Sequence, residues 1–268
     1  MKDILNEIVA HKRIEVARQQ EAISMKLLRD RLHSDNDLHR PVSMKQALKE
    51  SPHGIIAEFK RRSPSKGWIR QEADARLLPP AYEAAGASAL SILTDETFFG
   101  GSLRDLSTAR PLVSLPILRK DFVIDAYQLY QARVVGADAV LLIAACLSPV
   151  QCREFTALAH ELGLEVLLEV HSEEELAYIT PEVDMIGINN RHLGTFHTDV
   201  ENSFRLAGLL PKERVLVSES GIARPETLAR LRMAGFRGFL IGETFMKSEA
   251  PDRALQAFIT AIPTPDAL

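Results

Sequence analysis

The sequence has few cysteines, little excess charge and no long hydrophobic run. Its 268 residues include two cysteines, Cys146 and Cys152, without the spacing of a metal site, which suits a reducing compartment. A net charge of −4 argues against a protein dedicated to nucleic acid. No run of about 18 apolar residues occurs, and acidic residues interrupt the first turn of the chain. We therefore expect a cytoplasmic globular protein with no membrane span and no signal peptide.

The sequence also lacks the patterns of several catalytic classes. Ser218 and Ser220 have no obvious His and Asp partners, so acyl transfer is not expected. No Gly-x-Gly-x-x-Gly motif follows the first predicted strand, which disfavours a dinucleotide site. The histidines that could bind metal are scattered, without a helical His-x-x-x-His pair: His160, His171, His192 and His197. We expect neither a metal ion nor an organic cofactor.

After residue 54 the sequence alternates short apolar runs with amphipathic helical patterns. The predicted strands are 55–59, 88–93, 115–119, 138–143, 164–169, 184–189, 214–218 and 237–241. Helices are predicted at 77–85, 126–135, 149–162 and 225–234. Eight nearly continuous apolar strands, each with a crossover helix, predict a parallel sheet closed into a (β/α)8 TIM barrel. An open doubly wound sheet is the alternative.

The first fifty residues predict helices outside the barrel. Ile4, Leu5, Ile8 and Val9 form one apolar stripe at helical spacing, and further helical pieces are expected between 25 and 48. A solvated arm is the simplest interpretation, but the stripe favours packing on the barrel. We expect an N-terminal helical extension at 1–50, a barrel at 51–262 and a tail at 263–268.

Polar side chains collect where the predicted strands end. In a barrel these ends meet at one mouth, where enzymes of this fold hold their active sites. Glu58 and Lys60 could form only a structural ion pair, but similar residues follow most of the other strands. The candidates at these ends are Glu58, Lys60, Lys120, Glu169, Asn189, Arg191, Glu219, Ser220, Gly221, Gly242 and Glu243.

The residue types narrow the chemistry. Ser220-Gly221 and Gly242-Glu243 follow the last two strands, where barrels often bind phosphate through backbone N–H groups, although the glycines could serve only the turns. Lysines and an arginine around the mouth favour an anionic substrate, and glutamates supply candidate bases. The basic stretch 60–66 could instead be a nucleic-acid patch, but its place directly after a strand favours a small anion.

Several stretches closely resemble the indole-3-glycerol phosphate synthase family of tryptophan biosynthesis, in its single-function form. They are Ile56–Gly67, Ser91–Asp95, Phe98–Ser102, Leu118–Phe122, Leu168–Val170, Ile186–Arg191, Ser218–Ile222 and Leu240–Glu243. Trp68 and His192 depart from the usual family pattern, at positions without an assigned role. The resemblance implies ring closure of 1-(2-carboxyphenylamino)-1-deoxy-D-ribulose 5-phosphate, with loss of CO2 and water, by a carboxy-lyase without cofactor.

Residue roles follow from the resemblance motif by motif. Lys120 would be the general acid and Glu169 the base, while Lys60, oriented by Glu58, would hold an anionic group. Which lysine serves the dehydration step is left open. The remaining family positions are expected to hold the substrate or its phosphate: Ser63, Phe99, Phe122, Asn189, Arg191, Glu219, Ser220, Gly221, Gly242 and Glu243.

Two other functions stay open at this point. An aldolase-type barrel would use Lys120 or Lys60 as a Schiff-base nucleophile. A phosphate binder without activity would keep the phosphate loops but would not need the carboxylates. A small phosphorylated substrate is expected in either enzyme, and no sequence feature indicates association with other enzymes of the tryptophan pathway.

Overall fold

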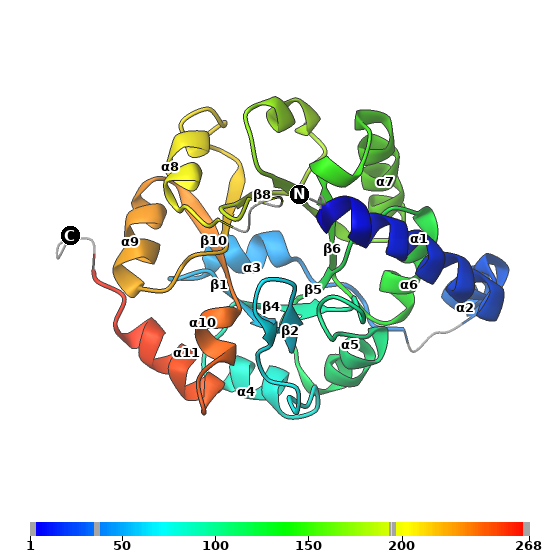
Figure 1. Cartoon of the computed structure of the whole chain (residues 1–268), viewed down its shortest axis with the longest axis horizontal. Coiled ribbons are helices and arrows are strands. Elements are labelled where there is room, and N and C mark those ends of the chain that lie inside the picture. The colour runs from blue at the N-terminus through cyan, green and yellow to red at the C-terminus, as the bar shows by residue number, and fades with distance from the viewer. Residues whose placement is uncertain (1–3, 35–37, 193, 195–196, 265–268) are drawn as a thin grey trace.

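The described residues of the computed structural model, 4–34, 38–192, 194 and 197–264, form a closed barrel of eight parallel strands. Around the barrel the strand order is β1-β10-β9-β8-β7-β6-β5-β4, and β4 pairs with β1 to close the ring. Strands occupy the centre and helices surround them (Figure 1). The strands are β1 (Ile55–Phe59), β4 (Ala89–Leu93), β5 (Ile117–Lys120), β6 (Ala139–Ile143), β7 (Glu165–Val170), β8 (Met185–Asn189), β9 (Val215–Glu219) and β10 (Phe236–Ile241). The predicted barrel is confirmed.

The strands are apolar throughout because both of their faces are covered. In β1, Ile56 packs in the cluster inside the barrel, whereas its neighbours Ile55 and Ala57 pack in the cluster between the strands and the outer helices. This alternation follows from the period of two along a strand. It also points Glu58, two residues after Ile56, toward the barrel interior.

The outer helices complete the barrel, and their starts are marked by side-chain caps. In α7, Ser148 and Gln151 form a capping box, and in α6 Asp125 and Gln128 do the same. The helices of the barrel are α4 (Leu78–Ala84), α5 (Leu103–Ala109), α6 (Ala126–Val134), α7 (Pro149–Glu161), α8 (Glu201–Ala207), α9 (Pro225–Met233), α10 (Glu243–Met246) and α11 (Pro251–Thr260).

Several elements differ from the sequence expectation. The expected crossover α-helix between β7 and β8 is replaced by the 3-10 helix η3 (Glu174–Tyr178); further 3-10 turns are η1 (Arg110–Leu112) and η2 (Ala144–Cys146). A short hairpin of β2 (Arg62–Ser63) and β3 (Gly67–Trp68) follows β1. The third predicted strand began at residue 115, but β5 begins at Ile117, because Pro116 has no N–H for the sheet and supplies only its carbonyl.

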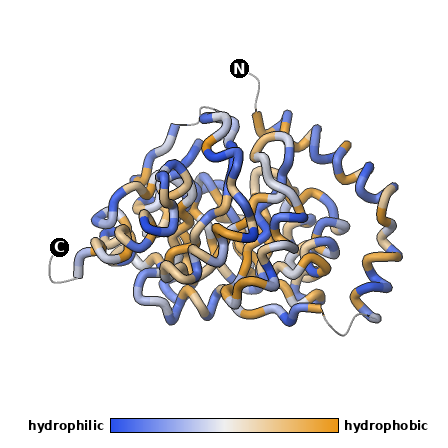
Figure 2. Tube along the Cα trace, turned by 90° about the horizontal axis from the view of Figure 1, so that it is seen from below, coloured by the Kyte–Doolittle hydropathy of each residue, from blue (hydrophilic) through white to orange (hydrophobic). Residues whose placement is uncertain are grey.

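The N-terminal segment forms three helices, α1 (Ile4–Ala22), α2 (Met25–Ser34) and α3 (Met44–Glu50). Helix α1 runs outward from near the barrel centre to α2, which packs on α6 (Figure 1). Met44 and Leu48 of α3 are fully buried in the barrel cluster, and α3 contacts β4, β9 and β10. Hydrophilic and hydrophobic residues are mixed along the helices at the edge of the molecule (Figure 2). The extension is therefore packed on the barrel.

Parts of the expected termini lie outside the described residues, namely 1–3 of the extension and 265–268 of the tail. In the part of the chain that the structure describes, no helix has the length and hydrophobicity needed to span a bilayer.

Candidate active site

A cavity of about 490 Å³ opens where the barrel strands end. All the candidate site residues line it except Ser63, which is buried in the β2–β3 hairpin. Leu5 and Ile8 of α1 form part of its wall. The polar strand ends that are far apart in the sequence therefore surround one cavity, which α1 partly covers.

Lys120 lies between two buried glutamates in this cavity. Its Nζ is 2.9 Å from Oε2 of Glu169 and 3.2 Å from Oε2 of Glu219. The three side chains come from β5, β7 and β9, and Glu58 comes from β1, so alternate strands of the barrel supply all four groups. Alternate strands are the ones that point side chains into the same layer of a barrel.

Burial and the charges of the neighbouring side chains shift the pKa values of Lys120, Glu169 and Glu219 in different directions. Burial would lower the pKa of Lys120, but Glu169 and Glu219 outweigh it and hold that pKa above its ordinary value. Burial would raise the pKa of Glu169, but Lys120 and the nearby His171 hold it below its usual range. Burial raises the pKa of Glu219 to about 8, and the negative charge of Glu169 adds to this against the opposing Lys120. At neutral pH the site thus contains an ammonium, a carboxylate and a neutral carboxyl.

Two glycines make room for the glutamates. A Cβ atom at Gly187 would lie 2.3 Å from Oε1 of Glu219, and one at Gly242 would lie 2.2 Å from Oε1 of Glu58. The Glu58 carboxylate is 2.5 Å from Nζ of Lys60. Each carboxyl group therefore occupies space that a side chain on the neighbouring strand would fill.

The loops after β9 and β10 form one side of the cavity, where backbone groups and cations could bind an anion. Ser220 and Gly221 adopt left-handed backbone conformations, with φ of 66° and 79°. The buried Asn190 donates to the carbonyl oxygen of Ser220 (3.0 Å) and so holds this loop. Arg191 donates to Oγ of Ser65 (3.0 Å), and its guanidinium is 3.7 Å from the carboxylate of Glu243. Lys66 and Lys247 add positive charge to the lining.

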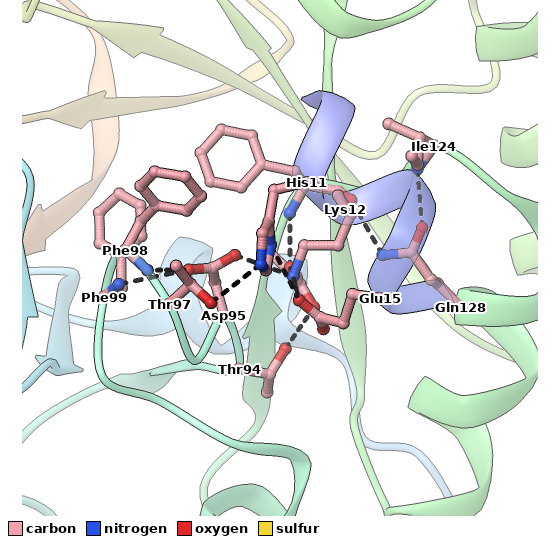
Figure 3. Close-up of polar contacts among 12 residues, drawn as sticks. His11, Lys12, Glu15, Thr94, Asp95, Thr97, Phe98, Phe99, Ile124 and Gln128 are labelled. Carbon is pink, nitrogen blue, oxygen red and sulfur yellow. Dashed lines mark hydrogen bonds and ion pairs between the residues drawn. The ribbon is translucent and has the colours of Figure 1, made fainter. Parts of the chain in front are cut away.

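Two aromatic rings form the wall near Lys120. The centroids of Phe99 and Phe122 are 5.9 Å apart. Their backbones are fixed by two aspartates that follow β4 and β5: Asp95 accepts from the N–H of Phe99, and Asp121 accepts from the N–H of Phe122. Figure 3 shows the polar contacts around Asp95, including the approach of Lys12 from α1.

His171 is a further residue of the site that the sequence reasoning treated as ordinary. Its Nε2 is 3.2 Å from Oε1 of Glu169, and its Nδ1 is 3.3 Å from Oε2 of Glu175. Burial would lower its pKa, but hydrogen bonds to the two glutamates raise the pKa of His171 to about 10. The spacing Glu169-x-His171 at a strand end, with Glu175 one turn later, was the available signal.

The described residues contain no group of three or more His, Cys, Asp or Glu side chains placed to hold a metal ion. The arrangement supplies instead a paired acid and base, cations and a loop suited to an anion. This arrangement at the mouth of a (β/α)8 barrel is typical of an enzyme of this fold, and its groups are of the kinds that transfer protons and bind anions.

Comparison with known proteins specifies the family. The model of the indole-3-glycerol phosphate synthase family matches residues 5–258. An indole-3-glycerol phosphate synthase of Bacteroides thetaiotaomicron is 67% identical over 262 residues, covering 98% of this chain and 100% of that protein. One from Burkholderia ambifaria is 42% identical over 257 residues, covering 95% and 98%. The chain therefore belongs to the indole-3-glycerol phosphate synthase family and is a carboxy-lyase of tryptophan biosynthesis.

Solved structures support the fold. A mutant tryptophan synthase alpha-subunit from Pyrococcus furiosus has a TM-score of 0.60 at 15% identity, covering 78% of this chain and 97% of that one. The tryptophan synthase subunit alpha from Legionella pneumophila has a TM-score of 0.59 at 15% identity, covering 82% and 96%. At this identity the likeness shows the barrel fold alone.

Proposed function

We propose that Lys120 is the general acid and Glu169 the base in the ring closure of 1-(2-carboxyphenylamino)-1-deoxy-D-ribulose 5-phosphate. The observation that carries this assignment is the 2.9 Å contact between a buried ammonium and a buried carboxylate at the barrel mouth. Lys120 donates a proton to the ketone oxygen as the aromatic carbon attacks the carbonyl carbon and a C–C bond forms. The carboxylate then leaves as CO2, and its bonding electrons restore the aromatic ring.

Dehydration completes the reaction. The new hydroxyl takes a proton from a lysine and leaves as water. The ring nitrogen donates electrons, through the benzene ring, to the carbon from which the hydroxyl departs. Glu169 stabilises the positive charge on nitrogen and accepts the proton that is released as the indole forms. Lys60 holds the substrate carboxylate and is oriented by Glu58, 2.5 Å away. Lys60 or Lys120 can supply the proton for the leaving water.

The other residues position the substrate. Phe99 and Phe122 pack on its ring. Glu219, neutral at pH 7, and Asn189 hydrogen-bond to polar atoms of the ribulose chain. The remaining residues provide a phosphate cradle whose left-handed loop and cations suit a dianion: Arg191, Ser220, Gly221, Gly242 and Glu243. Ser63 lies in the β2–β3 hairpin, and its buried Oγ has no hydrogen-bond partner among the described residues, so it stays a candidate substrate contact.

The electrostatics argue against the aldolase-type alternative. A Schiff-base lysine must be neutral to attack a carbonyl. The glutamates beside Lys120 hold its pKa above the ordinary value and keep it protonated. Trapping with borohydride and a keto substrate should therefore leave Lys120 unmodified.

The test uses Lys120→Met and Glu169→Gln, which remove a proton-transfer group with little change in volume. Turnover of the carboxyphenylamino ribulose phosphate is followed by indole fluorescence. Each variant should lose about 10²–10⁴-fold in kcat with a native far-UV circular dichroism spectrum. The exposed residues Lys212 and Glu213 provide matched controls, Lys212→Met and Glu213→Gln, which should retain wild-type kcat. Near-wild-type kcat in either site variant would refute its assignment, and a Lys120 variant that retains ring closure would identify Lys60 as the acid.

We also propose that the protein acts in the cytoplasm, which the two free thiols Cys146 and Cys152 support. Separation of cell fractions followed by the fluorescence assay tests this location.

A further inference from the structure

Helix α1 buries a lysine in a cluster of carboxylates next to the active-site cavity (Figure 3). The side chain of Lys12 has no exposed surface, and its Nζ lies 2.9 Å from carboxylate oxygens of Glu15, Asp95 and Asp121. Glu15 belongs to α1 itself, whereas the two aspartates belong to the barrel. Lys12 is therefore an ionic connection between the extension and the ends of β4 and β5.

The same two aspartates fix the loops that carry the aromatic wall. Oδ1 of Asp95 accepts from the backbone N–H groups of Phe98 (2.8 Å) and Phe99 (3.3 Å). Oδ1 of Asp121 accepts from the N–H of Phe122 (2.8 Å). Each aspartate thus connects Lys12 to the backbone of a ring that lines the cavity.

The aspartates depend on Lys12 to different degrees. Asp121 has a second cation, because its Oδ2 lies 2.8 Å from Arg119 and also accepts from Thr94 (2.7 Å). Asp95 is fully buried, and among the described residues its cationic partner is Lys12. A buried carboxylate without a partner is strongly disfavoured, so Asp95 and the loop it holds would rearrange without Lys12.

We propose that Lys12 is a positioning residue for catalysis: through Asp95 and Asp121 it holds Phe99 and Phe122 in place for the aromatic ring of the substrate. This inference rests on the proposed function, in which these two rings pack on the substrate. By this proposal, the N-terminal extension influences substrate binding mainly through the ion cluster of Lys12, Asp95 and Asp121. The apolar residues Leu5 and Ile8 then close the cavity only once Lys12 has placed α1.

The central variant is Lys12→Met, which keeps the length of the side chain and removes its charge. Its matched control is Lys26→Met, which removes an exposed lysine of α2 whose ion pair with Asp30 lies on the surface. Weaker packing of the two rings on the substrate loses roughly the burial free energy of one apolar side chain, so KM for the carboxyphenylamino ribulose phosphate should rise by about 10–100-fold in Lys12→Met. The kcat should stay within about threefold, because Lys120 and Glu169 do not contact Lys12. Lys26→Met should match the wild type in both constants.

Two inhibitors separate positioning from a general loss of structure. Anthranilate presents an aromatic carboxylate, and its inhibition constant should rise in Lys12→Met. Inorganic phosphate should bind at the opposite loops, and its inhibition constant should stay at the wild-type value. Lys12→Arg keeps a cation in the cluster and should restore most of the affinity for anthranilate.

The double variant Lys12→Met/Asp95→Asn covers the case in which the single variant does not fold, because it leaves no unpaired charge at Asp95. It should fold and still show the raised KM, since α1 and the wall remain unconnected. A KM within twofold of the wild type in Lys12→Met, or in the double variant, would overturn the inference. Equal weakening of anthranilate and phosphate would also overturn it, since that pattern indicates general disorder. If wild-type protein fails to turn over the substrate at all, the proposed function has failed and not the role of Lys12.

Discussion

Replacing Glu219 with Gln should stabilise the protein, and the gain should depend on pH. Glu219 is 1% exposed, and burial and the charge of Glu169 raise its pKa from 4.5 to about 8 despite the opposing Lys120. In the unfolded chain the same carboxyl has an ordinary pKa and is ionised at pH 7. Folding at pH 7 must therefore bind a proton, which costs free energy that Gln does not require.

The size of the effect follows from this difference in pKa. Each pH unit above the unfolded pKa costs about 1.4 kcal/mol until the folded pKa is reached. The cost is absent below pH 4.5, reaches about 3 kcal/mol at pH 7 and levels off near 5 kcal/mol above pH 8. Because the pKa of Glu219 is higher in the folded than in the unfolded protein, this carboxyl favours the folded state at low pH. That contribution to the free energy of unfolding is lost as the pH rises through about 8.

Thermal unfolding by circular dichroism measures the prediction. For a domain of this size, about 3 kcal/mol corresponds to a rise in Tm of roughly 6 °C at pH 7. The Tm difference between Glu219→Gln and wild type should be small at pH 4.5 and largest above pH 8. The exposed Glu213 gives the control Glu213→Gln, which should show a small, constant difference. A wild type that is more stable at pH 8, or a difference that does not change with pH, would show that Glu219 is ionised in the folded protein.

Further predictions concern the phosphate loop, the histidine, the extension and metal ions. Gly221→Asp should raise KM steeply and weaken inhibition by phosphate, because a side chain at the left-handed Gly221 meets Thr198 and adds negative charge; an unchanged phosphate inhibition constant would place the phosphate elsewhere. His171→Asn removes a cation 3.2 Å from Glu169, so the pKa that limits kcat at acid pH should rise; an unshifted acid limb would exclude this contact from catalysis. A chain that begins at Val42 should keep its circular dichroism per residue and lose kcat/KM mainly through KM; failure to fold, or unchanged kinetics, would contradict this. Turnover should persist in EDTA, since the described residues contain no candidate metal-ligand group; loss that a divalent ion restores would refute this.

Much of the fold could be predicted because each barrel strand is a short, continuous apolar run buried on both faces. The strand positions agree with the sequence expectation to within about two residues. The β2–β3 hairpin was missed because Arg62, Ser63 and Gly67 have no apolar alternation. Helix α11 completes the eighth strand–helix unit of the predicted barrel, although its residue range was not among the predicted helices.

The candidate site could be predicted as a set of positions but not as a set of contacts. Strand ends converge in any barrel, so their polar residues could be assigned to one mouth. Which groups pair depends on side-chain geometry across distant segments. The Lys12 cluster has no sequence pattern of its own, and the spacing Glu169-x-His171 indicates proximity but not the ion pair. Ser63 belongs to a matching motif and is buried without lining the cavity, so its expected contact with the substrate stays a prediction.

The position of α3 has a consequence for the order in which the chain folds. Met44 and Leu48 emerge early in synthesis, yet they are buried against strands that include β9 and β10, the last two of the barrel. A Cβ atom at Gly238 would lie 3.0 Å from Cδ1 of Leu48, so this contact can form only after residue 238 has been made. Met44 and Leu48 therefore lack these partners during almost the whole of translation, and we expect α3 to dock fully only when the ring of strands closes.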